Sequence, residues 1–332
     1  MSEKPMLITM GDPAGIGPEI TIKALSKRED NACKIVVVGD LSVLRDTARS
    51  LNVTTELHTV EDPLKAQNGV INVIDLNTIT PLSFEMGKPQ IICAKSAYQY
   101  IIAAIDFALK GQAGAVITNP INKEALNMAG IPFQGHTELF AHRTKVSDYS
   151  MIFQLENLAV AHVTTHCSLK DAITQITEQR VFTHIQLIDS YLKQTACSPA
   201  RIAVGGLNPH AGENGLFGTE ESQFIGPAIA RAQNQGIDVS GPYPPDTVFM
   251  RAFSGEFNGV VSMLHDHGFV ALKSRDFYHG VNITIGLPII RTSVGHGTAF
   301  DIAGKGVASK ESLLSAIAIA SKICRSNHHF QL

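Results

Sequence analysis

Three histidines follow apolar, strand-like stretches of the sequence, in positions that suit a metal site. His166 comes after LAVAHVTT, His210 after RIAVGGLNP and His265 after GVVSML. Ligands of open parallel sheets bind at the carboxyl ends of the strands. Neutral imidazole binds divalent metals, and three protein ligands with one open position is the arrangement of catalytic sites. A single such histidine more often only makes a hydrogen bond, so the predicted metal site depends on convergence of all three. His162 lies inside its strand and is expected in the core.

The glycine-rich stretch GHGTAFDIAGKG, residues 295–306, is a candidate nucleotide-binding loop. It lacks the dinucleotide pattern GxGxxG, because Phe300 stands at the third glycine. It also lacks the pattern of a P-loop, because Ala299 replaces the first glycine and Gly306 replaces the hydroxyl residue. A nucleotide bound here would therefore be held in another geometry.

Three polar residues near the segment VNITIGLPIIR could bind a phosphate. Lys273 precedes this segment, and Asn282 and Arg291 lie within it. A buried amide without a partner is costly, and cations with an amide donor suit a phosphate dianion. The alternative is that Lys273 and Arg291 are ordinary surface charges.

Other polar residues follow predicted strands or lie in glycine- and proline-rich loops. They are Asn119 and Asn122 in ITNPINKEAL, His136 and Thr137 in GHTELF, and Asp246 in GPYPPDTVF. Asn, Asp, Gly and Pro also shape turns without any ligand, which is the alternative interpretation of Asn119, Asn122 and Asp246.

Composition is that of an ordinary globular enzyme. The chain has 332 residues, enough for two domains, and is 44% hydrophobic. Its net charge of −3 gives no indication of a nucleic-acid or membrane partner. Five scattered cysteines indicate reduced thiols rather than a disulfide framework. We find no signal-peptide pattern and no apolar run long enough to span a bilayer, so we expect a cytoplasmic protein.

Predicted strands and helices alternate along the chain. Strands are expected at 6–10, 34–40, 69–76, 113–120, 158–166, 201–210, 259–268 and 281–288, and helices from Pro18, at 94–111 and near 168–193, 220–235 and 311–324. Alternation of this kind predicts an α/β fold with mostly parallel sheets. We expect two α/β domains. Residues 1–125 with 295–332 form the cofactor side, and residues 126–294 carry the metal, the substrate and the dimer contacts.

Several long motifs carry a resemblance to one enzyme family. They are GDPAGIGPE, ITNPINKEAL, GLNPHAGENGLFGTEE, GPYPPDT and GVNITIGLPIIRTSVGHGTAFDIAGKG. In order and over nearly the whole chain, they resemble the 4-hydroxythreonine-4-phosphate dehydrogenase family of vitamin B6 synthesis. The resemblance implies a homodimer that uses NAD and one divalent metal (Zn, Mg, Co or Mn). Such enzymes oxidise a secondary alcohol of a four-carbon phosphorylated acid, and the resulting 3-keto acid loses CO₂.

The same resemblance assigns roles to individual residues. It assigns the metal to His166, His210 and His265, with His265 supplied by the partner subunit. It assigns substrate contacts to five side chains: His136, Thr137, Lys273, Asn282 and Arg291. Asp246 is our candidate general base, and it could equally orient a metal-bound water.

The glycine-rich loop is similar to the adenosine-binding loop of isocitrate and isopropylmalate dehydrogenases. That similarity implies a non-Rossmann NAD fold of two α/β domains with the active site in the cleft between them. Cofactor contacts are then expected from five loop residues: His296, Gly297, Thr298, Asp301 and Gly304. NAD-dependent relatives carry Asp-Ile where this chain has Asp301 and Ile302. A carboxylate there accepts hydrogen bonds from the ribose hydroxyls and repels the 2′-phosphate of NADP, so we expect NAD.

Two departures from the biosynthetic enzymes bear on the substrate. This chain has His267 in HDHG where they have glutamine, and Gly295 where they have an acidic residue. Both changes resemble the branch that oxidises 4-phospho-D-threonate or 4-phospho-D-erythronate, with dihydroxyacetone phosphate as the product after decarboxylation. The alternative is the 4-phosphohydroxy-L-threonine dehydrogenase of pyridoxal phosphate biosynthesis. More distant alternatives are a nicotinamide-independent, metal-dependent lyase or aldolase on a sugar-acid phosphate, and a non-catalytic phosphosugar sensor.

Overall fold

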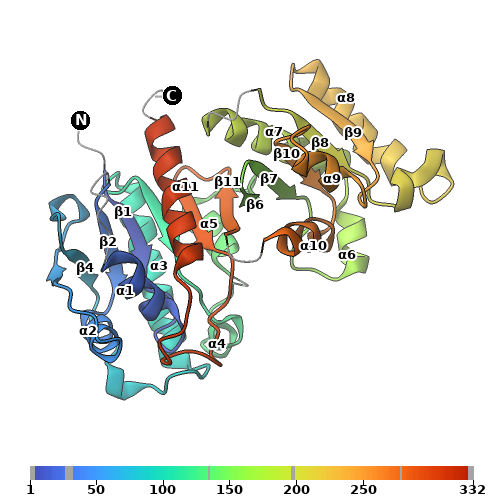
Figure 1. Cartoon of the computed structure of the whole chain (residues 1–332). Coiled ribbons are helices and arrows are strands. Elements are labelled where there is room, and N and C mark those ends of the chain that lie inside the picture. Colours follow the sequence, from blue (N-terminus) through green and yellow to red (C-terminus); the bar gives the residue numbers. More distant parts are fainter. Residues whose placement is uncertain (1–3, 27–32, 134, 196–198, 277–278, 328–332) are drawn as a thin grey trace. The chain divides into compact units, whose positions relative to one another are not determined.

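The computed structural model describes residues 4–26, 33–133, 135–195, 199–276 and 279–327, and the chain divides into two compact units (Figure 1). Unit 1 comprises Met1–Ser147 and Leu287–Arg325, and unit 2 comprises Asp148–Gly286 and Ser326–Leu332. These boundaries differ from the expected ones. Residues 126–147 and 287–294, which we expected in the second domain, belong to unit 1. For 290–294 the reason is strand pairing, since this segment extends the sheet of unit 1.

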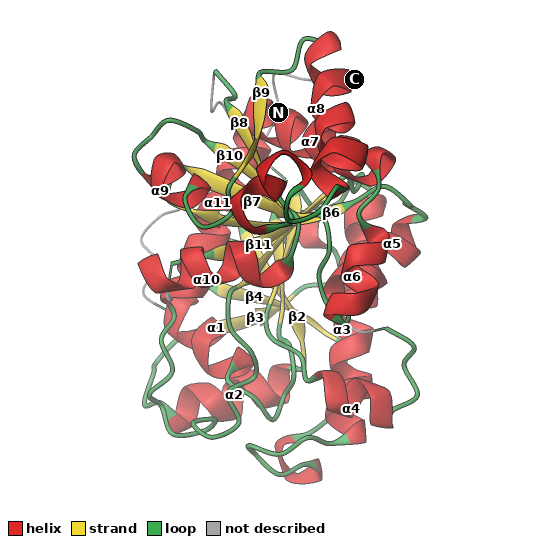
Figure 2. Ribbon diagram, turned by 90° about the vertical axis from the view of Figure 1, so that its right-hand side faces the viewer, coloured by secondary structure: helices red, strands yellow, loops and turns green. Residues whose placement is uncertain are grey.

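The sheet of unit 1 is parallel, in the order β3-β4-β2-β1-β5-β12. Its strands are β1 (Met6–Thr9), β2 (Ile35–Gly39), β3 (Leu57–Thr59), β4 (Ile71–Asp75), β5 (Ala115–Thr118) and β12 (Ile290–Val294). The central strands β1, β2 and β5 are buried along their whole length, as their continuous apolar runs predict. Helices lie around the strands (Figure 2): α1 (Gly17–Leu25), α2 (Leu41–Ser50), α3 (Ile91–Leu109), α4 (Lys123–Met128), α5 (His136–Thr144) and α11 (Glu311–Asn327), with short turns η1 (Pro63–Lys65) and η2 (Pro81–Ser83).

Helix α3 is a core helix of unit 1. By length and composition alone it could cross a membrane, contrary to our expectation that no segment would. Half of its most apolar window is nevertheless buried inside the structure. Tyr100, Ile101 and Ile105 are fully buried in the cluster that also contains Val36 and Val37 of β2. Its apolar character is therefore explained by packing on the sheet.

The sheet of unit 2 is mixed, in the order β11-β6-β7-β10-β8-β9. Its strands are β6 (Ser150–Leu155), β7 (Leu158–His162), β8 (Ile202–Gly205), β9 (Val239–Tyr243), β10 (Gly259–Ser262) and β11 (Val281–Ile285). Strand β6 runs antiparallel to β7 and β11, whereas β7, β10, β8 and β9 run parallel. The helices are α6 (Leu169–Gln175), α7 (Glu178–Gln194), α8 (Gly226–Asn234), α9 (Val248–Phe253) and α10 (His265–Arg275), with η3 (Pro209–Gly215) and η4 (Glu221–Ile225).

Two predicted elements are divided in the structure. The helix expected near 168–193 is α6 and α7, because Ile176 is extended and the hydroxyl of Thr177 caps a new helix by accepting the Arg180 N–H at 3.2 Å. The segment VNITIGLPIIR is not one strand but β11 and β12. Gly286, with φ of +90°, ends β11 in a conformation that favours glycine.

Candidate active site

A cavity of about 480 Å³ opens in unit 2 at the ends of β7 and β10. Because these strands are parallel neighbours, the residues that follow them meet at one edge of the sheet. The lining comes from two segments, Thr164–Leu169 with Ala172, and Leu264–Asp266. His166 and His265, two of the three predicted metal ligands, line this cavity.

The two imidazoles of the cavity are close and one is oriented by a carboxylate. The ring centroids of His166 and His265 are 5.7 Å apart. His265 Nδ1 lies 2.7 Å from Asp266 Oδ1, which makes Nδ1 the protonated nitrogen and leaves Nε2 as the ligand atom. The His265 ring also packs on Phe269, with 4.4 Å between centroids. This arrangement suits a divalent metal that takes imidazole ligands.

His210 lies outside this cavity lining, on a strained segment after β8. Residues 210–214 all have positive φ, and four of them are not glycine. A left-handed conformation of that kind costs free energy at each non-glycine residue. The buried carboxylate of Glu221 accepts the N–H groups of Leu207 and Asn208, both at 2.8 Å, and so anchors the start of the segment. Among the described residues, no group of three or more His, Cys, Asp or Glu side chains is placed to hold a metal.

The buried His162 confirms the expectation of a core histidine. It is 1% exposed, and its ring stacks on Phe269 with 4.6 Å between centroids. Burial first, and then the charge of His265, lowers its pKa to about 3. The backbone of Gly268 lies so close to this ring that a Cβ there would clash with Nε2, which explains the glycine of HDHG.

In unit 1, Arg291 lies on β12 beside β5 and is 2% exposed. The interpretation of Arg291 as a surface charge is therefore wrong. Its guanidinium donates to Thr118 Oγ1 at 2.9 Å and to Thr137 Oγ1 at 3.5 Å. Burial lowers the pKa of Arg291 to about 9. Thr118, which the sequence did not single out, is the last residue of β5 and so lies at the same edge of the sheet.

His136 begins α5 near the Arg291 guanidinium. Its Nε2 is buried and has no hydrogen-bond partner in the described part of the chain. Burial, followed by the charges of Arg291 and Lys123, holds its pKa well below the usual value. A buried cation, two hydroxyls and the N–H groups of a helix start together make an environment that favours an anion.

The other two predicted substrate residues are in unit 2. Asn282 lies on β11 opposite Phe153 of β6, and its Oδ1 is buried with no hydrogen-bond partner among the residues that the structure describes. Lys273 lies on α10 with its Nζ 4.9 Å from the centroid of the Phe269 ring. An orphaned buried amide oxygen is costly, which is consistent with a ligand contact at Asn282.

The glycine-rich loop follows β12 in unit 1. The His296 Nδ1 lies 3.0 Å from the Gly297 carbonyl, and its buried Nε2 has no partner within the described ranges. No heavy atom lies within 4 Å of the Cβ position at Gly297, so a ligand could approach the backbone there. Asp301 is exposed in the turn, and Gly304 has φ of +76°. These features leave backbone and one carboxylate accessible, as a nucleotide loop requires.

The remaining candidates have structural explanations or none. Asn122 Oδ1 caps α4 by accepting the Ala125 N–H at 2.7 Å, so the turn interpretation holds for Asn122. Asn119 is fully buried and donates to Thr21 Oγ1 at 2.7 Å. Asp246 is exposed in the turn before α9.

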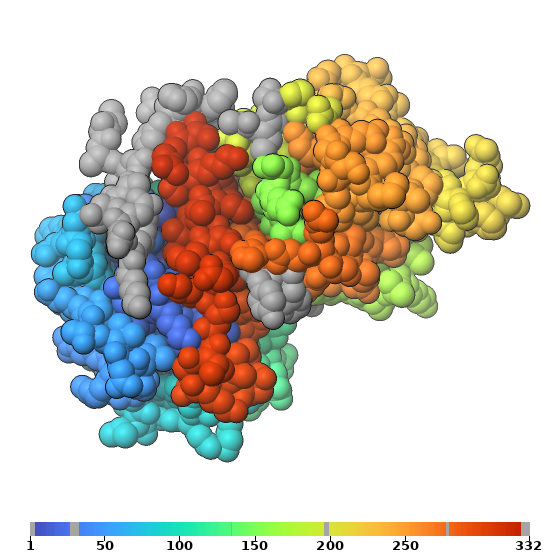
Figure 3. All heavy atoms as spheres, in the orientation of Figure 1, coloured from blue at the N-terminus to red at the C-terminus, as the bar shows by residue number. Residues whose placement is uncertain are grey.

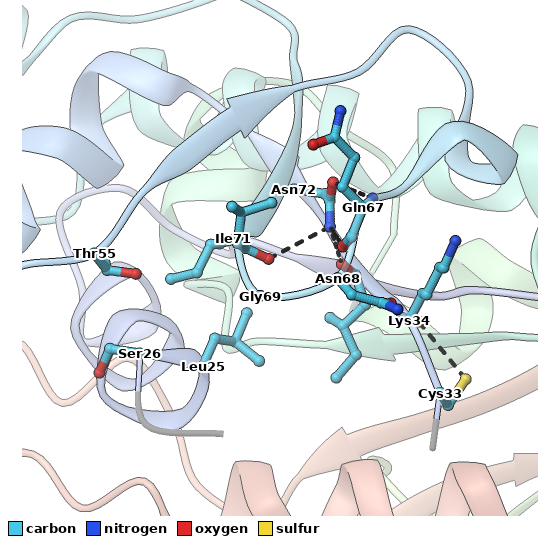
Figure 4. Close-up of a pocket in the computed structure, with 12 residues that line it drawn as sticks. Leu25, Ser26, Cys33, Lys34, Thr55, Gln67, Asn68, Gly69, Ile71 and Asn72 are labelled. Atoms are coloured by element: carbon cyan, nitrogen blue, oxygen red, sulfur yellow. Dashed lines mark hydrogen bonds between the residues drawn. The ribbon is translucent and has the colours of Figure 1, made fainter. Parts of the chain in front are cut away.

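A second hollow, of about 100 Å³, lies at the amino ends of β2 and β4 (Figure 4). Figure 4 shows Asn72 directed toward Gln67. The Asn72 amide donates to the Gln67 carbonyl and accepts from its N–H, both at 2.8 Å. Since ligands of parallel sheets bind at the opposite, carboxyl edge, this hollow is not a candidate active site.

Comparison with known proteins gives one consistent family. The family model described as pyridoxal phosphate biosynthetic protein PdxA matches residues 31–320. A D-threonate 4-phosphate dehydrogenase from Salmonella typhimurium is 47% identical over 97% of this chain and 100% of its own length. The crystal structure of a 4-hydroxythreonine-4-phosphate dehydrogenase from Klebsiella pneumoniae is similar with a TM-score of 0.87 and 44% identity, covering 97% of this chain and 99% of that one. A beta-decarboxylating dehydrogenase from Thermococcus kodakarensis, at 13% identity over 96% of this chain and 83% of that one, shares the fold with a TM-score of 0.51.

Proposed function

Because the chain belongs to the family of the pyridoxal phosphate biosynthetic protein PdxA, we propose that it is an NAD-dependent dehydrogenase of 4-phospho-D-threonate. The reaction removes hydride from C3 of the phosphorylated acid, and the 3-keto acid then loses CO₂ to give dihydroxyacetone phosphate. The names of the similar curated proteins support D-threonate 4-phosphate. The name of the Klebsiella structure keeps 4-phosphohydroxythreonine as the second candidate. 4-Phospho-D-erythronate, the diastereomer, is the third substrate to test.

The observation that carries this proposal is the buried Arg291. A guanidinium at 2% exposure, hydrogen-bonded to two threonine hydroxyls, is stabilised by an anion of matching geometry, and a phosphate offers one. His136 and Thr137 lie beside it and are proposed to contact the same group. Lys273 and Asn282 remain predicted substrate contacts.

The cavity in unit 2 is the proposed metal site. Its residues fit a divalent cation, because two imidazoles line it and a carboxylate orients one of them. A divalent cation supplies Lewis-acid polarisation of the substrate alcohol when bound. Asp246 remains the candidate base for the alcohol proton. The loop at 296–304 fits the adenosine half of NAD, with Asp301 as the group that faces the ribose.

We further propose that the enzyme is a homodimer whose metal site is completed across the interface. Large apolar side chains are exposed close to each candidate ligand. They are Leu169 (65%) and Ile173 (46%) on α6 after His166, Leu216 (72%) and Phe217 (49%) after His210, and Val270 (64%) on α10 after His265. Exposed apolar surface around three polar ligands is typical of a subunit interface.

The arrangement of ligands indicates which histidine is shared. We expected His265 from the partner subunit. Since His166 and His265 lie 5.7 Å apart in one chain, we propose instead that these two act together and that the partner contributes His210.

Mixing inactive variants tests this assignment. Heterodimers of His166→Ala with His210→Ala would contain one site with both lesions and one intact site, so about half of the activity should return. Heterodimers of His166→Ala with His265→Ala should stay inactive, because each site keeps one lesion. The opposite pattern would mean that His265 is the shared ligand, and no recovery in either pairing would place all three on one chain.

The function itself is tested by following NADH formation. Purified protein is incubated with NAD, Mg²⁺ or Zn²⁺, and each of the three phosphorylated acids. We expect the highest kcat/KM with 4-phospho-D-threonate. A preference for 4-phosphohydroxythreonine would assign the chain to the biosynthetic branch. Turnover of a phosphorylated acid without any nicotinamide would support the lyase or aldolase instead. The free cysteines Cys33, Cys93, Cys167 and Cys324 fit the reducing cytoplasm in which we propose that it works.

A further inference from the structure

A buried ion pair on α1 joins the start of the chain to the glycine-rich loop near its end. Glu19 is 3% exposed, and its Oε1 accepts the Lys23 ammonium at 2.7 Å, one helical turn along α1. The same carboxylate accepts two backbone N–H groups from the loop, Ala308 at 2.7 Å and Gly306 at 3.2 Å. We propose that Glu19 and Lys23 are positioning residues that hold this loop in the conformation that binds the dinucleotide.

Lys23 completes the contact from the other side. Its Nζ donates to the carbonyl oxygens of Gly306 and Ala308, both at 2.8 Å, as well as to Glu19. An ammonium has three donors, so all three are used. The pair therefore satisfies both the N–H and the carbonyl group of two loop residues. Four charge-assisted hydrogen bonds to backbone fix its path more strongly than neutral contacts would.

The opposite end of the loop is held by the segment before α1. The Ile16 N–H donates to the Thr298 carbonyl at 3.0 Å, and a Cβ at Gly15 would lie 3.0 Å from Thr298. Between the two anchors are Asp301 and Gly304, the residues proposed to face NAD. Figure 3 shows the C-terminal part of the chain, in red, on the surface of unit 1. An exposed loop anchored at both ends loses little further conformational entropy on binding.

The position of the pair argues for a role in cofactor binding rather than in stability alone. A buried ion pair contributes little net stability, because desolvation offsets the attraction. Here the pair spends its hydrogen bonds on a loop that has exposed residues and no regular structure from Gly295 to Ser309. This inference rests on the proposed NAD-dependent function. It predicts that loss of the pair weakens nicotinamide binding and leaves the phosphorylated acid unaffected.

The test uses three variants of the full-length protein. Lys23→Met removes the cation, and the double variant Glu19→Gln with Lys23→Met removes both charges and so leaves no buried charge unpaired. Lys193→Met is the matched control, because Lys193 forms an i,i+4 pair of similar length (2.6 Å) with Asp189 on α7, away from the loop. NADH affinity is measured by fluorescence titration, KM for each substrate by steady-state kinetics, and exchange of the Gly306 and Ala308 amides by hydrogen–deuterium exchange.

We expect about a tenfold weaker NADH affinity and a similar rise in KM for NAD in both loop variants, the loss expected for one charge-assisted contact. KM for the acid should stay within about twofold, the two amides should exchange faster, and Lys193→Met should resemble the wild type. Wild-type-like NADH binding by the double variant would overturn this inference alone, and so would an equal rise in both KM values. Failure of the wild type to bind NADH would overturn the proposed function together with the inference.

Discussion

Replacing Arg291 with methionine should make the ligand-free protein more stable and its phosphate binding weaker. Burial lowers the Arg291 pKa from 12.5 to about 9, so the charged form in the fold costs about 5 kcal/mol relative to water. Its hydrogen bonds to Thr118 and Thr137 recover part of this cost. Methionine has a similar length and no charge to desolvate. Replacing a buried charge by a well-packed apolar side chain stabilises by about 1–4 kcal/mol, which is the gain expected here.

The pH of the measurement follows from the sign of the shift. Arginine is charged when protonated, and its folded pKa lies below its unfolded pKa, so the folded state resists protonation. The cost of the charge is complete below pH 9 and decreases only above it. Urea unfolding near neutral pH therefore shows the full difference between the two proteins.

The same titration with inorganic phosphate or the phosphorylated acid measures the binding role. The ligand should raise the unfolding free energy of the wild type, because it binds only the folded state. Loss of the charge-assisted contact should weaken binding by about ten- to a hundredfold, so the ligand should hardly stabilise the variant.

Arg143→Met is the control for this experiment. Arg143 is an arginine with 45% of its side chain exposed, paired with Asp106, and its loss should change stability by less than about 1 kcal/mol without changing the effect of phosphate. Strong destabilisation of ligand-free Arg291→Met would refute the reasoning, because Arg291 would then be a structural ion-pair partner. Full protection of this variant by phosphate would exclude Arg291 from the phosphate site.

Three further predictions concern the metal, the cofactor and acid stability. Removing divalent metal with a chelator should abolish NADH formation and adding Mg²⁺ or Zn²⁺ should restore it; full activity in verified metal-free protein would exclude the metal site. Wild type should prefer NAD over NADP in kcat/KM, and Asp301→Lys with Ile302→Tyr should shift the preference toward NADP, because the ribose acceptor becomes a cation; an unchanged preference would contradict the adenosine-loop assignment. Burial lowers the His184 pKa from 6.5 to about 4, so the unfolded state takes up the proton first and stability should fall between these pH values. His184→Gln should remove about 3 kcal/mol of that loss, and an unchanged slope in urea titrations would show that His184 is not its source.

Much of the fold could be predicted locally. The runs MLIT, IVVVG and AVIT are buried parallel strands, because continuous β-branched and apolar residues suit a strand covered on both faces. The predicted break points were less accurate. A single hydroxyl cap at Thr177 separates α6 from α7, and the apolar pattern on both sides gave no sign of it.

The residues of the candidate site could be predicted by type but not by environment. The strand-end position of His166 and His265 predicted that they would lie at one edge of a sheet, and the parallel pairing of β7 with β10 brings them together. Pattern alone could not show which histidines share a chain. That depends on strand order, which is set by contacts between residues far apart in the sequence.

The sequence by itself determined the family, the α/β class and the chemical types of the side chains, because these depend on motifs and on local hydrophobic periodicity. Only the tertiary structure decided which charges are buried. Arg291 became a desolvated cation because β12 pairs with β5, and Glu19 met Gly306 and Ala308 although more than 280 residues separate them. Burial and pairing of polar groups arise from long-range packing, and a charge has the same local sequence pattern whether it faces water or the core.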